Sequence, residues 1–188
     1  MNIKKYIEEA YKTACANGFH DEDKPIEHWL MLVITEVSEA VEADRKSKRA
    51  NIAMFENESI TPQAPEHIAK HWQFCFEQFI KDTVEDEFAD ICIRLFDLAG
   101  TFNYTFELST SYEFNEKLIK KFKQRTFTEV AYELCTALAR QKPHISTIDI
   151  AFAFVVYWAK SLDIDLKWHI EQKMKYNKLR TRLHGKKY

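Results

Sequence analysis

Two segments of the chain each carry a pair of acidic side chains three positions apart. Glu36 and Glu39 form the first pair, and Glu87 and Asp90 form the second. Residues at i and i+3 share one face of an α-helix, and both pairs lie beside an apolar stripe. A single pair of this kind is most often a solvated acidic patch. Two such pairs on antiparallel helices would bring four carboxylates together. That density of like charge requires a cation, for which oxygen ligands favour Mg²⁺ or Mn²⁺.

Basic and polar residues near the end of the sequence share one face of the last expected helix. They fall at i, i+3, i+4 and i+7 and are Lys173, Tyr176, Asn177 and Arg180. Lysine supplies a point charge and arginine a two-pronged donor, so this face could bind a polyphosphate. The alternative is a solvated basic helix end that complements the helix dipole. Arg94, one turn after Asp90, is expected either to join the phosphate contacts or to pair with Asp97.

Other metal chemistries fit the sequence poorly. A di-iron carboxylate bundle needs Glu-x-x-His, and no glutamate here has a histidine three residues later. His67 and His71 have the spacing of a zinc helix, but Ile68 replaces the glutamate of H-E-x-x-H, which favours an incidental surface pair. The cysteines are too widely spaced for a paired metal motif and are expected to be reduced core thiols. They are Cys15, Cys75, Cys92 and Cys135.

The composition excludes several classes of protein. Only three of the 188 residues are glycine, and none share a loop, which excludes a Walker loop, a dinucleotide-binding fingerprint and a kinase glycine-rich loop. The 27 basic and 29 acidic side chains leave a formal charge of −2, which argues against a general nucleic-acid binder. No apolar segment approaches the roughly 20 residues of a membrane span. We therefore expect a cytoplasmic protein with no membrane partner, in which side chains rather than backbone loops hold any phosphate.

Helical periodicity dominates the chain and predicts an all-α bundle of about seven helices. The helical signals for this bundle fall in eight ranges, at about 2–17, 25–48, 65–81, 84–102, 112–124, 127–141, 147–162 and 165–179, with residues 50–64 as a connection. The acidic pairs fall on the second and fourth of these ranges. The phrases ITEV at 34–37 and FTEV at 127–130 form a faint echo. This echo indicates either a degenerate internal duplication of a helix pair or a coincidence between two amphipathic helices.

The two acidic pairs and the sequence segments around them resemble the motifs of the MazG-like all-α nucleoside triphosphate pyrophosphohydrolases. Their signature, E-x-x-E on one helix and E-x-x-D on another, is matched by EVSE at 36–39 and EFAD at 87–90. The resemblance extends to GFHDEDKP leading into LVITEVSEAVEADR, to DTVEDEFADICIRLFDLAG and to IDLKWHIEQKMKYNKLRTRLHGKKY. These phrases look like a phage and bacterial branch of the family. The resemblance implies Mg²⁺-dependent cleavage of a (deoxy)nucleoside triphosphate to the monophosphate and pyrophosphate.

The resemblance also implies roles for individual residues. The metal ligands would be Glu36, Glu39, Glu87 and Asp90, and a glutamate of the first pair would orient or deprotonate the attacking water. The substrate-binding residues would be Arg94, Lys173, Tyr176, Asn177 and Arg180. The base would lie against aromatic side chains near the site, for which the candidates are Phe19, His20 and Trp29.

The sequence departs from the family pattern in two places. A helix at about 65–81 is inserted between the acidic pairs, and a segment at about 103–162 separates the second pair from the basic face. We expect residues 1–188 to form one MazG-like domain, as a homodimer, or as a monomer if the extra segment replaces a partner subunit. Two other functions fit the same residues. One is a catalytically weak nucleotide-binding or regulatory protein, and the other is a helical interaction protein with solvated acids.

Overall fold

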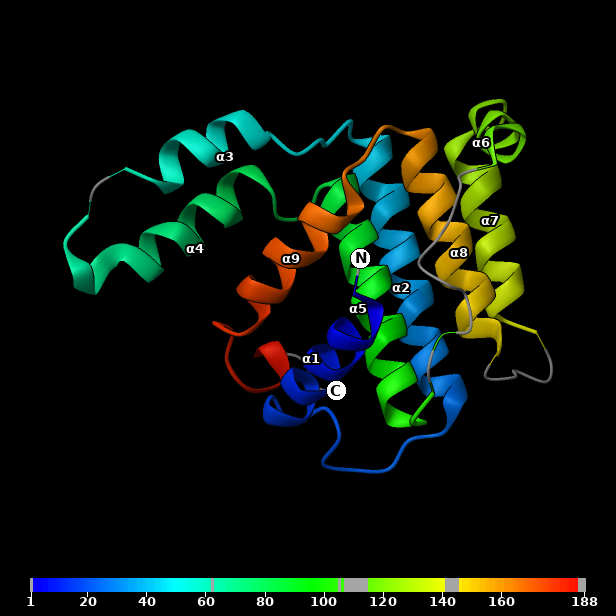
Figure 1. Ribbon diagram of the computed structural model, residues 1–188, viewed down its shortest axis with the longest axis horizontal. Coiled ribbons are helices and arrows are strands. Elements are labelled where there is room, and N and C mark those ends of the chain that lie inside the picture. Colours follow the sequence, from blue (N-terminus) through cyan, green and yellow to red (C-terminus); the bar gives the residue numbers. More distant parts are fainter. Residues whose placement is uncertain (1, 62, 105, 107–114, 141–145, 186–188) are drawn as a thin grey trace.

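All regular secondary structure in the described residues is helical, which confirms the all-α class. The computed structural model describes residues 2–61, 63–104, 106, 115–140 and 146–185 (Figure 1). These residues contain nine α-helices and two 3₁₀ turns, compared with the expected total of about seven helices. In chain order the elements are α1 (Ile3–Ala16), α2 (Ile26–Arg45), α3 (Ile52–Ser59), η1 (Pro65–His67), α4 (Ile68–Phe79), α5 (Val84–Thr101), α6 (Glu116–Lys123), α7 (Phe127–Leu138), α8 (Ser146–Ser161), α9 (Leu166–Asn177) and η2 (Arg182–Gly185).

Helix α5 is the central element of the fold. It begins at a Thr83 cap, whose side chain accepts a hydrogen bond from the Asp86 amide. Its predicted apolar stripe is fully buried, and it packs against α1, α2, α8 and α9. Helix α2 runs antiparallel to α5 along one side (Figure 1). The two helices that carry the acidic pairs are therefore neighbours in opposite directions, as the metal-site hypothesis requires.

The extra segment completes a helical bundle around this pair. Helix α7 packs on α2 and α8 packs on α5, while α6 lies against α8 (Figure 1). In the sequence echo Glu129 corresponds to Glu36, but Glu129 forms a capping box with Thr126 at the start of α7. Glu36 lies in the middle of α2, so the two glutamates have different structural positions. Residues 105, 107–114 and 141–145 of the extra segment lie outside the described residues.

Residues 50–64, expected to be a connection, contain helix α3. The Asn51 side chain caps this helix by accepting a hydrogen bond from the Met54 amide, and Phe55 is buried against α4. His71 on α4 bonds the Glu58 carbonyl with an Nε2–O distance of 2.8 Å. The expectation of a simple connection is therefore wrong, because a cap and one buried aromatic residue are enough to hold a two-turn helix. Helices α3 and α4 form a hairpin that projects from the bundle (Figure 1).

The apolar residues form two clusters. The larger one fills the space between α1, α2, α5, α7, α8 and α9. The smaller one holds the α3–α4 hairpin and consists of Phe55, Trp72, Cys75, Phe76, Ile80 and Tyr176. Because Tyr176 belongs to α9, the hairpin packs on the same helix that carries the predicted basic face.

Two further sequence expectations concern thiols and membranes. All four cysteines are free. Cys75 and Cys92 are buried and Cys135 is partly buried, whereas Cys15 is exposed, so the core assignment is wrong for Cys15. It lies in the last turn of α1, after the buried residues Tyr6, Ile7 and Ala10 of this helix. None of the described helices combines the length and the apolar character needed to cross a bilayer.

Candidate functional site

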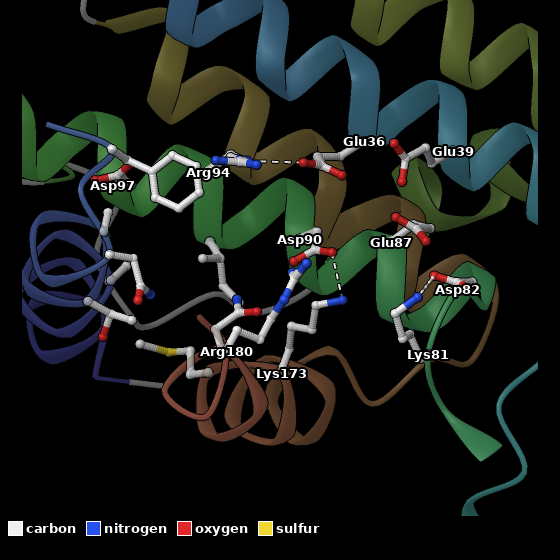
Figure 2. Close-up of a pocket in the computed structure, with 18 residues that line it drawn as sticks. Glu36, Glu39, Lys81, Asp82, Glu87, Asp90, Arg94, Asp97, Lys173 and Arg180 are labelled. Carbon is white, nitrogen blue, oxygen red and sulfur yellow. Dashed lines mark hydrogen bonds and ion pairs between the residues drawn. The ribbon is translucent and has the colours of Figure 1, made fainter. Parts of the chain in front are cut away.

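A pocket of 290 Å³ lies between α1, α2, α5 and α9. Eight of the nine predicted site residues line it: Glu36, Glu39, Glu87, Asp90, Arg94, Lys173, Asn177 and Arg180. The carboxylates come from α2 and α5, and the cations Lys173 and Arg180 come from the opposite side of the pocket (Figure 2). Antiparallel packing explains the convergence, because it sets Glu36 beside Arg94 and Glu39 beside Glu87.

Three of the four signature carboxylates form a tight group. One carboxylate oxygen from each of Glu36, Glu39 and Glu87 lies within 4.8 Å of the others. Glu36 and Glu87 are buried, with 4% and 3% of their surface exposed, and Glu39 is exposed. The group therefore has two oxygen donors held by the core and one that faces solvent.

Glu87 is the least compensated of these acids. Its Oε2 atom is buried and has no hydrogen-bond partner. Burial, followed by the negative charges of Asp90 and Asp86, raises the pKa of Glu87 to about 9. Burial and the charge of Asp90 also raise the pKa of Glu36, although Arg94 opposes them. An excess of negative charge with an unpaired oxygen fits a divalent cation at this group.

Asp90 takes part in a different interaction. The buried Lys173 ammonium lies 2.7 Å from an oxygen of Asp90 and 2.7 Å from an oxygen of Asp86. Burial acts to lower the pKa of Lys173, but the two carboxylates outweigh it and the pKa is raised. Burial raises the pKa of Asp86 to about 6 even though Lys173 acts to lower it. Lys173 is thus a charged side chain clamped between two aspartates.

Asp86 is a site residue that the sequence reasoning missed. It is 1% exposed, and in addition to Lys173 it accepts a hydrogen bond from the Asp82 amide at 3.0 Å. In the sequence it belongs to the acidic run Glu85-Asp86-Glu87, where acids at a helix start are expected simply to favour the helix dipole. The available signal was the spacing of four between Asp86 and Asp90, which places both on one face towards α9.

Arg94 binds one of the predicted metal ligands. Its Nε donates to Glu36 at 3.0 Å, and its guanidinium lies 5.5 Å from the centre of the Phe19 ring. Asp97, the sequence-based alternative partner, instead bonds His20 with an Nε2–Oδ1 distance of 2.8 Å. Arg94 therefore partly neutralises the acidic group from within the fold.

The three aromatic candidates for base contact have different positions. Phe19 lines the pocket. His20 is not among the lining residues and holds Asp97, and Trp29 is buried with its ring 4.6 Å from that of His20. Of the three, only Phe19 is placed where a ligand in the pocket could reach it.

Tyr176 is the predicted site residue that does not line the pocket. Its ring stacks on Phe76 of α4 at 4.6 Å, and its hydroxyl donates to Glu77 at 2.8 Å. The side chain thus points from α9 towards the hairpin rather than towards the carboxylates. Among the described residues, the three-residue groups that could hold a metal do not include His67 or His71.

Acids from α2 and α5 lie across the pocket from two cations of the C-terminal part of the chain. The acids Glu36, Glu39 and Glu87 face the cations Lys173 and Arg180 across its width (Figure 2). Comparisons with family models, with curated proteins and with solved structures find no match to the chain. A function is therefore inferred from the chemistry of the pocket.

Proposed function

We propose that this chain is a Mg²⁺-dependent nucleoside triphosphate pyrophosphohydrolase, which cleaves a (deoxy)nucleoside triphosphate to the monophosphate and pyrophosphate. The observation that carries the proposal is the convergence of Glu36, Glu39 and Glu87 within 4.8 Å, facing cations across one pocket. Oxygen donors for a hard cation and ammonium or guanidinium donors for phosphate are the two parts that phosphoryl chemistry requires. The resemblance of the acidic phrases to the MazG-like family supports the same activity.

The residues of the acidic group fit a divalent cation. Glu36, Glu39 and Glu87 would hold Mg²⁺ or Mn²⁺, and the unpaired, buried oxygen of Glu87 supports this assignment. Asp90 would become a fourth ligand if its ion pair with Lys173 opened and Lys173 stayed paired with Asp86 alone. When bound, the cation would neutralise phosphate charge and lower the pKa of a water molecule.

The remaining groups would bind the substrate and handle the proton. Lys173, Arg180 and Asn177 would contact the phosphate oxygens, with the nucleoside directed towards Phe19 at the α1 side of the pocket. Glu36 is already bound by Arg94, so Glu39 is the better placed carboxylate to orient the attacking water and accept its proton.

The direct test is pyrophosphate release from the common and damaged (deoxy)nucleoside triphosphates in the presence of Mg²⁺. We expect at least one substrate, and we expect Glu39→Gln and Asp90→Asn to abolish its turnover. Glu42→Gln is the matched control, because Glu42 lies one turn after Glu39 on α2 and pairs only with surface residues. Glu39→Gln and Asp90→Asn proteins as active as the wild type would refute the proposal.

A nucleotide-binding protein without turnover is the second candidate. Two internal ion pairs favour this candidate. Arg94 pairs with Glu36 and Lys173 pairs with Asp90, so two of the four predicted metal ligands already have a cationic partner within the protein. Thermal stabilisation by a nucleotide with Mg²⁺, but no product after hours of incubation, would select this function. An absence of stabilisation by metal and nucleotide alike would leave only a helical interaction protein.

A further inference from the structure

The α3–α4 hairpin, which the acidic motifs do not include, reaches the pocket at its base. Lys81 and Asp82, in the turn between α4 and α5, line the pocket beside the acidic group. Figure 2 shows both next to Glu87, at the end of the pocket opposite to Asp97. Glu87 and Asp97 are ten residues apart on α5, which corresponds to roughly 15 Å along the helix axis. The hairpin therefore contributes to one particular end of the site.

The position of this turn is fixed by the bundle. Asp82 lies in the turn after α4 and has a φ of 59°, a left-handed conformation, and its amide donates to Asp86 at 3.0 Å. At the other leg of the hairpin, the Ala50 amide donates to Glu85 at 3.0 Å and the Asn51 amide donates to the Phe79 carbonyl at 2.9 Å. Both legs are thus tied to the start of α5, so Lys81 is held near the carboxylates.

The hairpin is also attached to the helix that carries the other cations. Tyr176 of α9 stacks on Phe76 and donates to Glu77, both in α4. The Lys175 ammonium lies 3.9 Å from the centre of the Trp72 ring. These contacts hold α4 against α9. They therefore also fix the position of Lys81, which follows α4, relative to Lys173 of α9, and both lysines line the acidic end of the pocket.

Lys81 differs from Lys173 in its freedom to meet a ligand. Lys173 is buried between two aspartates, whereas the Lys81 side chain is 32% exposed and pairs with the 55% exposed Asp82 at 2.6 Å. An ion pair between neighbouring exposed residues is weak and can exchange for a phosphate oxygen. In the absence of a ligand, Asp82 thus holds the Lys81 ammonium at the lining of the pocket.

We propose that Lys81 binds the terminal phosphates of the substrate, so that the hairpin supplies a subsite for the pyrophosphate part. This inference rests on the proposed function for the nature of the ligand. With the nucleoside near Phe19 and Asp97, the phosphate chain runs along α5 past the acidic group, and its distal end meets Lys81. A nucleoside monophosphate does not extend to this end. Lys81 is therefore a residue that favours triphosphates over monophosphates.

The test is calorimetric titration of the full chain with inorganic pyrophosphate in the presence of Mg²⁺. We expect Lys81→Gln to weaken pyrophosphate binding about tenfold, the effect of one charge-assisted contact, and Lys81→Arg to retain it. Lys70→Gln is the control. Lys70 is an exposed residue of α4 that does not line the pocket, and its replacement by glutamine changes the net charge by the same amount. Circular dichroism of each variant checks that the helices are intact.

The outcomes separate this inference from the proposed function. Wild-type pyrophosphate affinity in Lys81→Gln, an equal loss in Lys70→Gln, or no pyrophosphate binding by the wild type would each overturn the subsite. Loss of affinity in Lys81→Gln together with no hydrolysis of any triphosphate by the wild type would retain the subsite and refute the enzyme. Hydrolysis of a triphosphate by the wild type, together with unchanged pyrophosphate affinity in Lys81→Gln, would support the enzyme and refute the subsite.

Discussion

Replacement of Lys173 by methionine tests the electrostatic core of the pocket. Lys173 is 3% exposed, and its ammonium lies 2.7 Å from an oxygen of Asp86 and 2.7 Å from an oxygen of Asp90. Methionine fills a similar volume but leaves Asp86, which is 1% exposed, without its cation. Removal of one partner from a buried ion pair costs about 3–5 kcal/mol, a large part of the roughly 5–15 kcal/mol that stabilises a typical domain.

This cost should depend on pH in a defined direction. Burial raises the folded-state pKa of Asp86 from its ordinary 3.8 to about 6 while Lys173 is present, and loss of Lys173 raises the pKa further. A carboxyl group with a raised folded-state pKa binds more protons when folded than when unfolded. Its contribution to stability is therefore full below the ordinary pKa and is lost as the pH rises through the folded-state value. The destabilisation by Lys173→Met should accordingly be larger at pH 8 than at pH 5.

Urea unfolding at pH 5 and pH 8, in the presence of EDTA, measures both effects. Lys178→Met is the matched control, since Lys178 makes a surface ion pair with Glu9 and its loss should cost about 1 kcal/mol or less. Asp86→Asn in the Lys173→Met background should recover part of the loss, because it removes the uncompensated charge. Equal losses for Lys173→Met and Lys178→Met at both pH values would refute the reasoning.

Two further predictions concern Glu87 and Gly100. Because the folded-state pKa of Glu87 is raised from 4.5 to about 9, the metal-free protein should lose stability as the pH rises from 5 to 9. Glu87→Gln should flatten this dependence in urea titrations with EDTA, and an unchanged slope would contradict the assignment. At Gly100 an added Cβ would lie 2.5 Å from the Tyr11 Cβ, so Gly100→Ala should destabilise by about 1–3 kcal/mol despite better helix propensity. Thermal unfolding checks this, and a neutral or stabilised variant would show that α1 and α5 can move apart.

The helices that carry the site were predictable because their signals are local. The apolar stripe of α5, from Phe88 to Leu98, is fully buried, and Thr83 caps this helix. Helical periodicity needs only a few turns of sequence to be recognised. The same logic failed for α3, which is eight residues long and whose burial rests on a single aromatic residue, Phe55. So short a segment gives too few repeats for a periodic signal.

The side-chain partners within the site were much less predictable. Tyr176 shares a helical face with Lys173 in sequence spacing, yet its ring packs on Phe76 in a hairpin whose position no local pattern indicates. Arg94 was given two expected roles, and in the structure it binds Glu36. The role of Asp86 was not recognised, because several acidic residues stand together at the start of α5. Each of these outcomes depends on which element lies opposite, and spacing along one helix carries no such information.

The sequence by itself determined most of the helices and the two acidic pairs on them, and its few glycines exclude a glycine-rich phosphate loop. Those properties follow from residue type and spacing within one or two helices. Tertiary structure decided that Glu36, Glu39 and Glu87 converge while Asp90 is held by Lys173. It also placed Lys81 at the pocket and Tyr176 outside it. The physical reason is that charge pairing and burial depend on distances between helices, which packing of the whole core sets.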